Sequence, residues 1–179
     1  KLLASSPLPR EAILAAVVTT QRSTYINVDK DGKPLRPAIV WLDVRKADTT
    51  KLINPAIALL LKAVGLYPLV NYGVGYCRSN WIQQNQPEIW DQTHKFLCLS
   101  GFLNHRLTGE FKDSAGNMIG TLPFDVKKFN WAGKLDPKWR FFPIDRAKLV
   151  DLGNPGDRLG EITAAASAQT GIPQGLPVF

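Results

Sequence analysis

The chain has 179 residues, of which 45% are hydrophobic and 21% are charged, and its formal net charge is +7 at neutral pH. This composition is typical of a globular domain and excludes a wholly disordered chain, and the length usually corresponds to one domain. The longest apolar run, 56–61, is far shorter than the roughly 20 residues of a membrane-spanning helix, so no membrane partner is expected.

The first part of the chain is predicted to form three strands of one sheet. The continuous apolar run 12–18 is typical of a strand covered on both faces, as in the centre of an α/β sheet. The runs 23–28 and 37–42 are rich in apolar and β-branched residues. Asp-Gly followed by Lys-Pro lies between them, and this turn chemistry indicates that the two runs are adjacent antiparallel strands.

Helices are predicted in the middle of the chain. Asn54 as N-cap, Pro55 at the first helical position and Gly65 past the end indicate a helix over 55–64. This helix is apolar on all sides, so we expect it to be buried. Residues 67–75 contain a proline and two glycines and are predicted to form a loop. Further helices are predicted over 78–84, 87–90 and 93–107.

The last third of the chain is predicted to be less regular. We expect a loop and a short turn over 120–134 and a helix over 139–152. Thr163 as N-cap and Gly171 past the end indicate a short alanine-rich helix between them. The apolar run 176–179 predicts a strand that the chain stops inside. Because the sequence also lacks an initiator methionine, we expect a piece of a longer protein.

The cysteines and histidines do not form a metal-binding pattern. Cys77 and Cys98 are far apart in the sequence, and His94 and His105 lie outside any zinc-type spacing. We therefore predict no metal site. The thiols are expected to be reduced, as in a cytoplasmic protein, and a disulfide between them is the alternative that stays open.

The basic residues are scattered along the chain. The densest group consists of Lys127, Lys128, Lys134, Lys138 and Arg140, interleaved with Phe129, Trp131 and Trp139. This interleaving is compatible with a stacking platform for single-stranded nucleic acid. Aromatic rings beside long cationic side chains more often cover apolar surface, however, so we predict no nucleic-acid partner.

Three stretches, in one consistent order, resemble the FGGY carbohydrate kinases, the family that includes glycerol kinase, xylulokinase, gluconokinase and ribulokinase. The first, 15–47, resembles the family's strand, Gln-Arg loop, Asp-Gly turn and Trp-x-Asp-x-Arg segment. The second, 95–131, contains LSGFLNHRLTGEF and GTLPFDVKKFNW, which resemble the family's helix, Leu-Thr-Gly stop and Phe-Asp turn. The third, 156–178, contains GDRLGEIT and TGIPQGLPV and resembles the segment before the family's core strand.

The resemblance implies an α/β fold: an actin-like, ribonuclease-H-like domain with a mixed sheet and flanking helices, here lacking its first strands and its end. Members of the family transfer the γ-phosphoryl group of MgATP to a sugar hydroxyl between two such domains. Residues 1–179 would then be part of the N-terminal, sugar-binding domain, without the second, nucleotide-binding domain. A homo-oligomeric parent is compatible with this reading, and its substrate would be a sugar or polyol.

A sugar site needs paired hydrogen-bond donors and carboxylates. The resemblance implies that Arg22, in the loop with Gln21, contacts substrate hydroxyls, and the alternative for Arg22 is a surface ion pair. Ser23 stands where glycerol kinases have glutamate. The missing carboxylate makes glycerol less favoured than a larger sugar.

A sugar site also needs an aromatic face for the C–H side of the ring. By resemblance, Trp41 contacts the carbon skeleton of the substrate, while Asp43 and Arg45 shape the edge of the pocket. Tyr72 aligns more loosely with a substrate-contacting tyrosine. For Trp41 and Tyr72 the alternative is a packing role. Asp113 falls where the family often has Thr-Asp, but the residues after it differ and no role is assigned.

Phosphoryl transfer requires a phosphate cradle, a Mg²⁺ site and a carboxylate base. By resemblance, these functions belong to an Asp-x-Gly-Thr hairpin and to an aspartate after the strand that starts near Leu176, and neither motif lies within 1–179. We therefore predict no catalytic, cofactor-binding or metal-binding residue in this chain. ATP and Mg²⁺ are cofactors of the full-length parent, and neither is expected to bind this fragment.

The leading hypothesis is thus a fragment of an ATP-dependent carbohydrate kinase that is inactive alone. The alternative is a non-catalytic binding or scaffold module that retains the fold. A third hypothesis, an oligonucleotide-binding ribonuclease-H-like domain, predicts salt-dependent retention on nucleic acid, which we do not expect.

Overall fold

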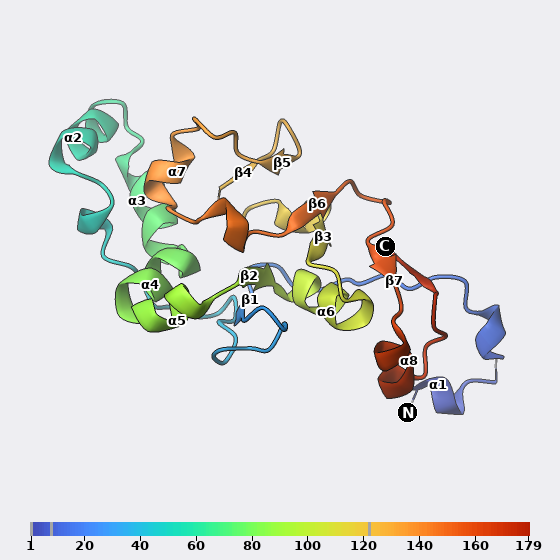
Figure 1. Ribbon diagram of the computed structural model, residues 1–179. Coiled ribbons are helices and arrows are strands. Elements are labelled where there is room, and N and C mark those ends of the chain that lie inside the picture. The colour runs from blue at the N-terminus through green and yellow to red at the C-terminus, as the bar shows by residue number, and fades with distance from the viewer. Residues whose placement is uncertain (1, 8, 122) are drawn as a thin grey trace.

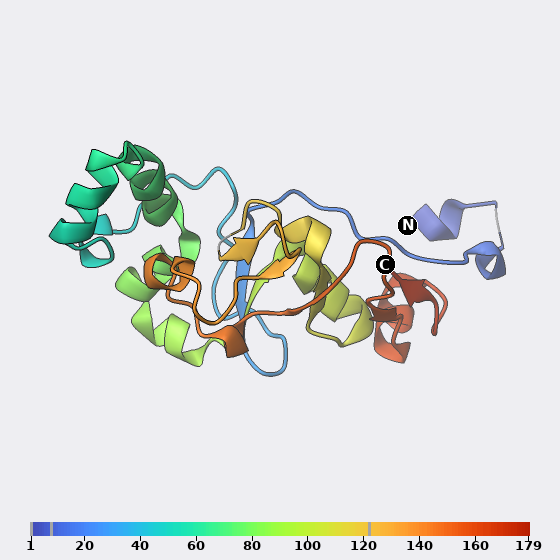
Figure 2. The same ribbon diagram turned by 90° about the horizontal axis from the view of Figure 1, so that it is seen from above.

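The computed structural model describes residues 2–7, 9–121 and 123–179, which form an elongated molecule (Figures 1 and 2). The helices α2 to α5, within residues 55–92, gather at one end, and α8 (Ala164–Thr170) and β7 (Gly160–Glu161) lie at the other end near both termini. Strands β1 (Tyr25–Val28) and β2 (Lys95–Cys98) and helix α6 (Leu99–Thr108) lie between the two ends (Figure 1). No helix in these ranges is long and apolar enough to cross a membrane.

The described residues form four two-stranded sheets. Three pairs are antiparallel: β1 (Tyr25–Val28) with β2 (Lys95–Cys98), β4 (Phe124–Asp125) with β5 (Asn130–Trp131), and β7 (Gly160–Glu161) with β8 (Pro177–Val178). The fourth pair, β3 (Lys112–Ser114) with β6 (Asp151–Gly153), is parallel. The pairings are therefore mixed, as the sequence predicts, but they are short and do not merge into one broad sheet.

The run 12–18 is extended, but only one of its faces is covered. The amide of Ala16 donates to the carbonyl of Pro177 at 2.9 Å, so this run lies parallel to β8. Leu14 and Val17 are 80% and 74% exposed. The predictions of a strand covered on both faces and of a sheet shared with β1 are wrong, because an apolar run does not specify which neighbours reach it.

The predicted pairing of the next two runs is confirmed in a shorter form. The amides of Tyr25 and Ile39 donate to each other's carbonyls at 2.9 and 3.0 Å, which makes a single antiparallel bridge. The turn between the runs is held by the carboxylate of Asp29, which accepts from two amides at 2.9 Å. Gly32 in this turn has a φ of +73°, a conformation that favours glycine.

Helix α2 (Pro55–Ala63) begins as predicted, because the side chain of Asn54 accepts from the amide of Ile57 at 2.9 Å. The prediction that this helix is buried is wrong. None of its residues is buried, and Leu59 and Leu60 are 71% and 64% exposed. One face packs on the cluster around Val74, and an all-apolar composition cannot show that the other face lacks cover.

Residues 67–75, predicted to be a loop, belong to helix α3 (Tyr67–Tyr76). Pro68 lies in the first turn, where no amide donor is needed. Gly75 is buried, and a Cβ atom there would lie 3.3 Å from the side chain of Thr49. The proline and glycine therefore mark a helix start and a close helix contact instead of turns.

The two short helices predicted next are confirmed as α4 (Arg78–Asn85) and α5 (Pro87–Gln92). The predicted helix over 93–107 is partly wrong, because its first part is β2 and α6 (Leu99–Thr108) begins only afterwards. Phe96 and Leu97 pack in separate clusters, as neighbouring residues of a strand do. Over so short a segment, the spacing of the apolar residues fits both the helical period of about 3.6 residues and the strand period of about 2 residues.

The predicted helix over 139–152 is wrong. This segment contains part of α7 (Lys138–Phe141), a 3₁₀ turn and β6. Pro143 follows the C-cap residue Phe142 of this short helix, and a residue before a proline disfavours helical geometry. The alanine-rich helix is confirmed as α8 (Ala164–Thr170), capped by Thr163, and the last predicted strand is confirmed as β8.

The remaining short elements are α1 (Leu2–Ser5) and the 3₁₀ helices η1 (Arg10–Ala12), η2 (Thr49–Lys51), η3 (Ala115–Met118) and η4 (Arg146–Lys148).

Asp113 on β3 is fully buried and joins three elements. Its carboxylate accepts from the Ser100 hydroxyl at 2.6 Å, the Ser114 amide at 2.7 Å and the Asn117 side chain at 2.8 Å. A Cβ atom at Gly101 would lie 3.0 Å from this carboxylate, so α6 approaches β3 closely here. Asp113 therefore fixes the start of α6 relative to η3.

We expect the stability advantage of aspartate over asparagine at position 113 to shrink as the pH rises. Burial raises the pKa of Asp113 above its ordinary value, so the folded state binds the proton more tightly than the unfolded state. The advantage is fully present below the unfolded pKa and is lost as the pH rises through the folded pKa. Urea unfolding of the wild-type chain and of Asp113→Asn at about pH 4 and about pH 7 measures this.

Asp31→Asn, at an exposed position of the turn after β1, controls for the general effect of removing a carboxylate. If the stability advantage of Asp113 over asparagine instead grows with pH, the hydrogen bonds to its carboxylate lower its pKa by more than burial raises it, which would contradict the prediction.

Candidate functional site

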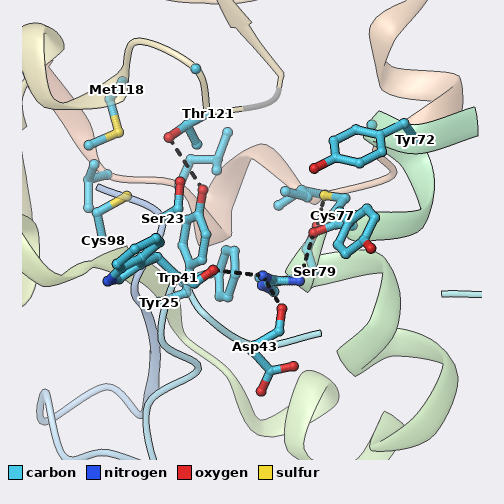
Figure 3. Close-up of a pocket in the computed structure, with 18 of the residues that line it drawn as sticks. Ser23, Tyr25, Trp41, Asp43, Tyr72, Cys77, Ser79, Cys98, Met118 and Thr121 are labelled. Carbon is cyan, nitrogen blue, oxygen red and sulfur yellow. Dashed lines mark hydrogen bonds between the residues drawn. The ribbon is translucent and has the colours of Figure 1, made fainter. Parts of the chain in front are cut away.

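A cleft of about 500 Å³ lies between the junction of α3 and α4 and the strands β1 and β2. The loop 41–44, Trp131 and residues of the segments 118–121 and 144–150 also line it. Figure 3 shows Cys98, Met118 and Thr121 on one side of the cleft and Tyr72 and Cys77 on the other. The walls therefore come from segments that are far apart in the sequence.

Tyr25 lies on the β1 side of the cleft. Its hydroxyl donates to the Thr121 hydroxyl at 3.4 Å, and its ring stacks on Phe96 with 4.9 Å between centroids. Burial raises the pKa of the Tyr25 hydroxyl well above its ordinary value. The phenol therefore stays neutral and remains a hydrogen-bond donor.

Both cysteines line the cleft and neither forms a disulfide. Burial raises the pKa of Cys77 and raises that of Cys98 to about 12. The thiol of Cys77 lies 3.1 Å from the hydroxyl of Ser79. Because the thiolate is the nucleophilic form, these side chains act as weakly polar wall atoms and not as nucleophiles.

Two aromatic side chains line the cleft and stay accessible. Trp41 is 53% exposed and Tyr72 is 64% exposed. Tyr72 packs against Tyr76 with ring centroids 4.5 Å apart. Trp41 and Tyr72 therefore offer apolar ring surface to a bound molecule.

Asp43 lines the cleft next to Trp41 and forms an ion pair with Arg45. The Arg45 Nε donates to both carboxylate oxygens, at 2.9 and 3.0 Å, and the Arg45 guanidinium lies 4.2 Å from the centre of the Trp81 ring. The hydrogen bonds from the Arg45 side chain lower the pKa of Asp43 to about 2, although partial burial opposes them. Asp43 is therefore an ionised acceptor at neutral pH.

Gln21 and Arg22 lie beside the cleft and do not line it in this structure. The Gln21 side chain donates to the Thr24 hydroxyl at 3.1 Å, and the Arg22 guanidinium donates to the carbonyl of Ile119 at 3.0 Å. Ile119 stands between two residues that do line the cleft, so Arg22 is at its rim. The structure thus brings Trp41, Asp43 and Tyr72 together and leaves Gln21 and Arg22 outside.

Ser23, directly after Arg22, does line the cleft and has a φ of +63°. A residue other than glycine in this left-handed region carries backbone strain of about 1–3 kcal/mol. Such strain persists only where the surroundings hold the backbone in place. The turn at 21–23 is therefore held by its neighbours at the edge of the cleft.

Arg78 is a cleft residue that the sequence did not reveal as one. It is 8% exposed, and its guanidinium donates to the carbonyl of Asp43 at 2.6 Å. In the sequence it was only the first residue of a predicted short helix. The available signal is a charged residue at the start of a predicted helix, and this signal does not identify its partners.

Among residues 2–7, 9–121 and 123–179, no group of three or more histidine, cysteine, aspartate or glutamate side chains is placed to hold a metal ion. The charged side chains that line the cleft are Asp43 and Arg78, and each is already paired. The cleft offers no free cationic side chain from the described residues to a triphosphate, so its lining does not fit a nucleotide.

Comparison with sequence families and curated relatives gives consistent matches. The model of the "FGGY family of carbohydrate kinases, N-terminal domain" matches residues 1–179. An L-fuculokinase of Escherichia coli is 30% identical over 182 residues, which covers 98% of this chain and 36% of the relative. A xylulose kinase of Lactococcus lactis subsp. lactis is 27% identical over 163 residues, which covers 89% of this chain and 31% of the relative. The chain thus spans about a third of the length of these relatives.

Solved structures show the same fold. A gluconate kinase from Lactobacillus acidophilus has a TM-score of 0.67 at 17% identity, over 93% of this chain and 33% of that chain. A glycerol kinase from Plasmodium falciparum, solved with ADP, has a TM-score of 0.64 at 22% identity, over 93% of this chain and 33% of that chain. The fold is therefore the actin-like, ribonuclease-H-like class that the sequence predicts.

Replacing Arg45 with methionine is expected to raise the pKa of Asp43 from about 2 toward the ordinary value of about 3.9. The reason is that the methionine side chain cannot donate hydrogen bonds to the carboxylate. In the wild type, the stabilisation from this pair is present above the unfolded pKa and is lost as the pH falls through about 2. A ¹³C NMR titration of the Asp43 carboxyl carbon measures the midpoint.

Arg22→Met is the matched control, because Arg22 donates to the Ile119 carbonyl and not to Asp43. An Asp43 midpoint that is the same in wild type and Arg45→Met would contradict the assignment.

Proposed function

The chain belongs to the FGGY family of carbohydrate kinases, whose N-terminal-domain model matches residues 1–179, and from this premise we propose that it forms the sugar-binding part of an ATP-dependent kinase. The parent enzyme phosphorylates a hydroxyl of a sugar or polyol. The observation that carries the proposal is the cleft in which the exposed Trp41 ring and the ionised Asp43 carboxylate lie side by side in the lining.

A sugar fits this combination of groups. Its hydroxyls donate to the Asp43 carboxylate, while the C–H face of the ring packs on Trp41 and Tyr72. The neutral Tyr25 hydroxyl and the hydroxyls of Ser79 and Thr121 supply further polar atoms in the lining. Arg22 and Gln21, at the rim, are proposed to contact the substrate once it is bound.

The dimensions of the cleft favour a substrate larger than glycerol. Its volume of about 500 Å³ lies in the range of about 300–1,000 Å³ that is typical of ligand pockets. Ser23 contributes a short hydroxyl to the lining, where a longer acidic side chain would fill space and bind two small hydroxyls. A pentulose, hexulose, larger polyol or aldonate is therefore the proposed substrate class.

The transfer step itself is assigned to other parts of the parent. ATP and Mg²⁺ supply the phosphoryl group and the charge stabilisation in such reactions, and the lining of the cleft does not fit a triphosphate. We propose that a second, nucleotide-binding domain holds both. The residues of this chain bind and orient the sugar and shield one side of it from water, so the chain alone is proposed to be inactive as a kinase.

A phosphorylation screen tests the proposed function. The full-length protein that carries this sequence is incubated with MgATP and a panel of pentuloses, hexuloses, polyols and aldonates, and ADP release is measured. We expect phosphorylation of at least one sugar, and none by the 179-residue chain alone. Binding of a sugar without turnover by the full-length protein would instead support a non-catalytic binding module, and inactivity with no binding would contradict the proposal.

Trp41→Ala is expected to raise the KM for the sugar by about tenfold, which corresponds to about 1.4 kcal/mol of lost contact. The KM for ATP should stay unchanged, because Trp41 is placed on the sugar side. Val40→Ala is the matched control, since Val40 is the adjacent exposed residue and does not line the cleft. Equal KM values for wild type and Trp41→Ala would contradict the role of this ring.

A further inference from the structure

We propose that Arg78 is the positioning residue of the cleft: its guanidinium holds the backbone of the loop 41–45 and thereby sets the affinity for the sugar. This inference rests on the proposed function of the cleft. Arg78 acts through the loop and not by contact with the reacting atoms.

The guanidinium of Arg78 gathers carbonyls from two segments. Its Nη2 donates to the carbonyls of Asp43 at 2.6 Å and Trp41 at 3.4 Å. Its Nη1 donates to the carbonyls of Tyr76 at 3.2 Å and Arg45 at 3.4 Å. The carbonyls of residues 41, 43 and 45 thus converge on one side chain, which is itself anchored at the junction of α3 and α4.

The loop has little else to fix it. Leu42 and Val44 are 66% and 79% exposed, so their side chains do not pack it in place. A backbone hydrogen bond from Ala47 to the carbonyl of Gly75, at 2.8 Å, ties down its far end. The Asp43–Arg45 hydrogen bonds lie within the loop, and the contact of Arg45 with helix α4 is a ring contact, its guanidinium 4.2 Å from the centre of the Trp81 ring. Among the described residues, Arg78 is therefore the side chain whose hydrogen bonds tie the Trp41–Asp43 part of the loop to the helices.

A planar guanidinium, unlike an ammonium group, has donors in the directions needed to bind several converging carbonyls. A guanidinium carries five N–H donors in fixed directions, whereas an ammonium is a compact point charge on a flexible stem. Both terminal nitrogens of Arg78 are already engaged with carbonyls. Although Arg78 lines the cleft, it has few donors left for a substrate, which is why a positioning role fits better than a binding role.

The test compares Arg78→Met, Arg78→Lys and the control Arg146→Met in the full-length kinase. Arg146 also donates to a backbone carbonyl, that of Ala132 at 2.6 Å, but it does not touch the loop 41–45. Its guanidinium lies 5.1 Å from the centre of the Trp139 ring, as that of Arg78 lies 6.0 Å from the centre of the Tyr76 ring. We expect Arg78→Met to raise the KM for the sugar by about tenfold or more while kcat and the KM for ATP change by less than about threefold. The KM of Arg78→Lys for the sugar should lie between the values of the wild type and of Arg78→Met. The KM of Arg146→Met should equal that of the wild type.

A second readout does not depend on sugar turnover. Trypsin cleaves after Arg45 and Lys46, which lie in or next to the loop. We expect the rate of cleavage at these two bonds, followed by mass spectrometry, to rise by about tenfold or more in Arg78→Met and to stay unchanged in Arg146→Met. Circular dichroism verifies that each variant is folded. If Arg78→Met does not fold, the KM and the cleavage rate of Arg78→Lys are compared with the wild type instead.

The two readouts separate the possible failures. An unchanged KM for the sugar together with unchanged cleavage in the folded Arg78 variants would overturn the inference, and so would a loss of kcat at constant KM. If the wild type phosphorylates no sugar of the panel while Arg78→Met is cleaved faster, the proposed function fails but the loop-holding role of Arg78 stands.

Discussion

Hydrogen bonds from basic side chains to backbone carbonyls hold the loops of this chain in place. Buried backbone carbonyls need donors, and sheets of two short strands supply few of them. Long cationic side chains supply donors to partly buried carbonyls at several places: Lys95 at Leu149, Arg146 at Ala132, and Lys148 at Trp90 and Thr93. They also donate to carbonyls at exposed places: Arg22 at Ile119, Lys95 at Ala147 and Lys112 at Arg158. Much of the excess positive charge therefore has a structural use, and a polyanionic partner is not needed to explain it.

The cleft is built in the same way. Arg78 holds the loop that carries Trp41 and Asp43, and Lys95 holds the carbonyl of Leu149 at 2.7 Å on another wall. The Trp131 ring, also in the lining, donates to the carbonyl of Val150 at 2.8 Å. The walls are thus joined by contacts from side chain to backbone across long sequence separations, and not by one continuous ladder of strands.

This construction explains what the sequence could and could not predict. The caps at Asn54 and Thr163 are local, because the bonds that define them span three residues, and the helices that they begin were predicted correctly. Trp41, Asp43 and Tyr72, which line the cleft, were proposed as site residues from a resemblance of short motifs. Arg78 was not, because the loop carbonyls that it binds lie 33 to 37 residues away. The cover of the run 12–18 and the strand at β2 likewise depend on distant neighbours that no local pattern encodes.

Because the loop 41–45 is held through its backbone carbonyls, its position depends little on which side chains it presents to the cleft. Arg78 binds the carbonyls of Trp41 and Asp43, and any residue at those positions would offer the same carbonyl. The side chains can therefore change while the loop keeps its place. Relatives that share this domain carry names as different as xylulose kinase, L-fuculokinase and glycerol kinase. Since one fold hosts many specificities through the groups placed on it, a loop held by its backbone is a physical means by which the choice of sugar can vary without loss of the fold.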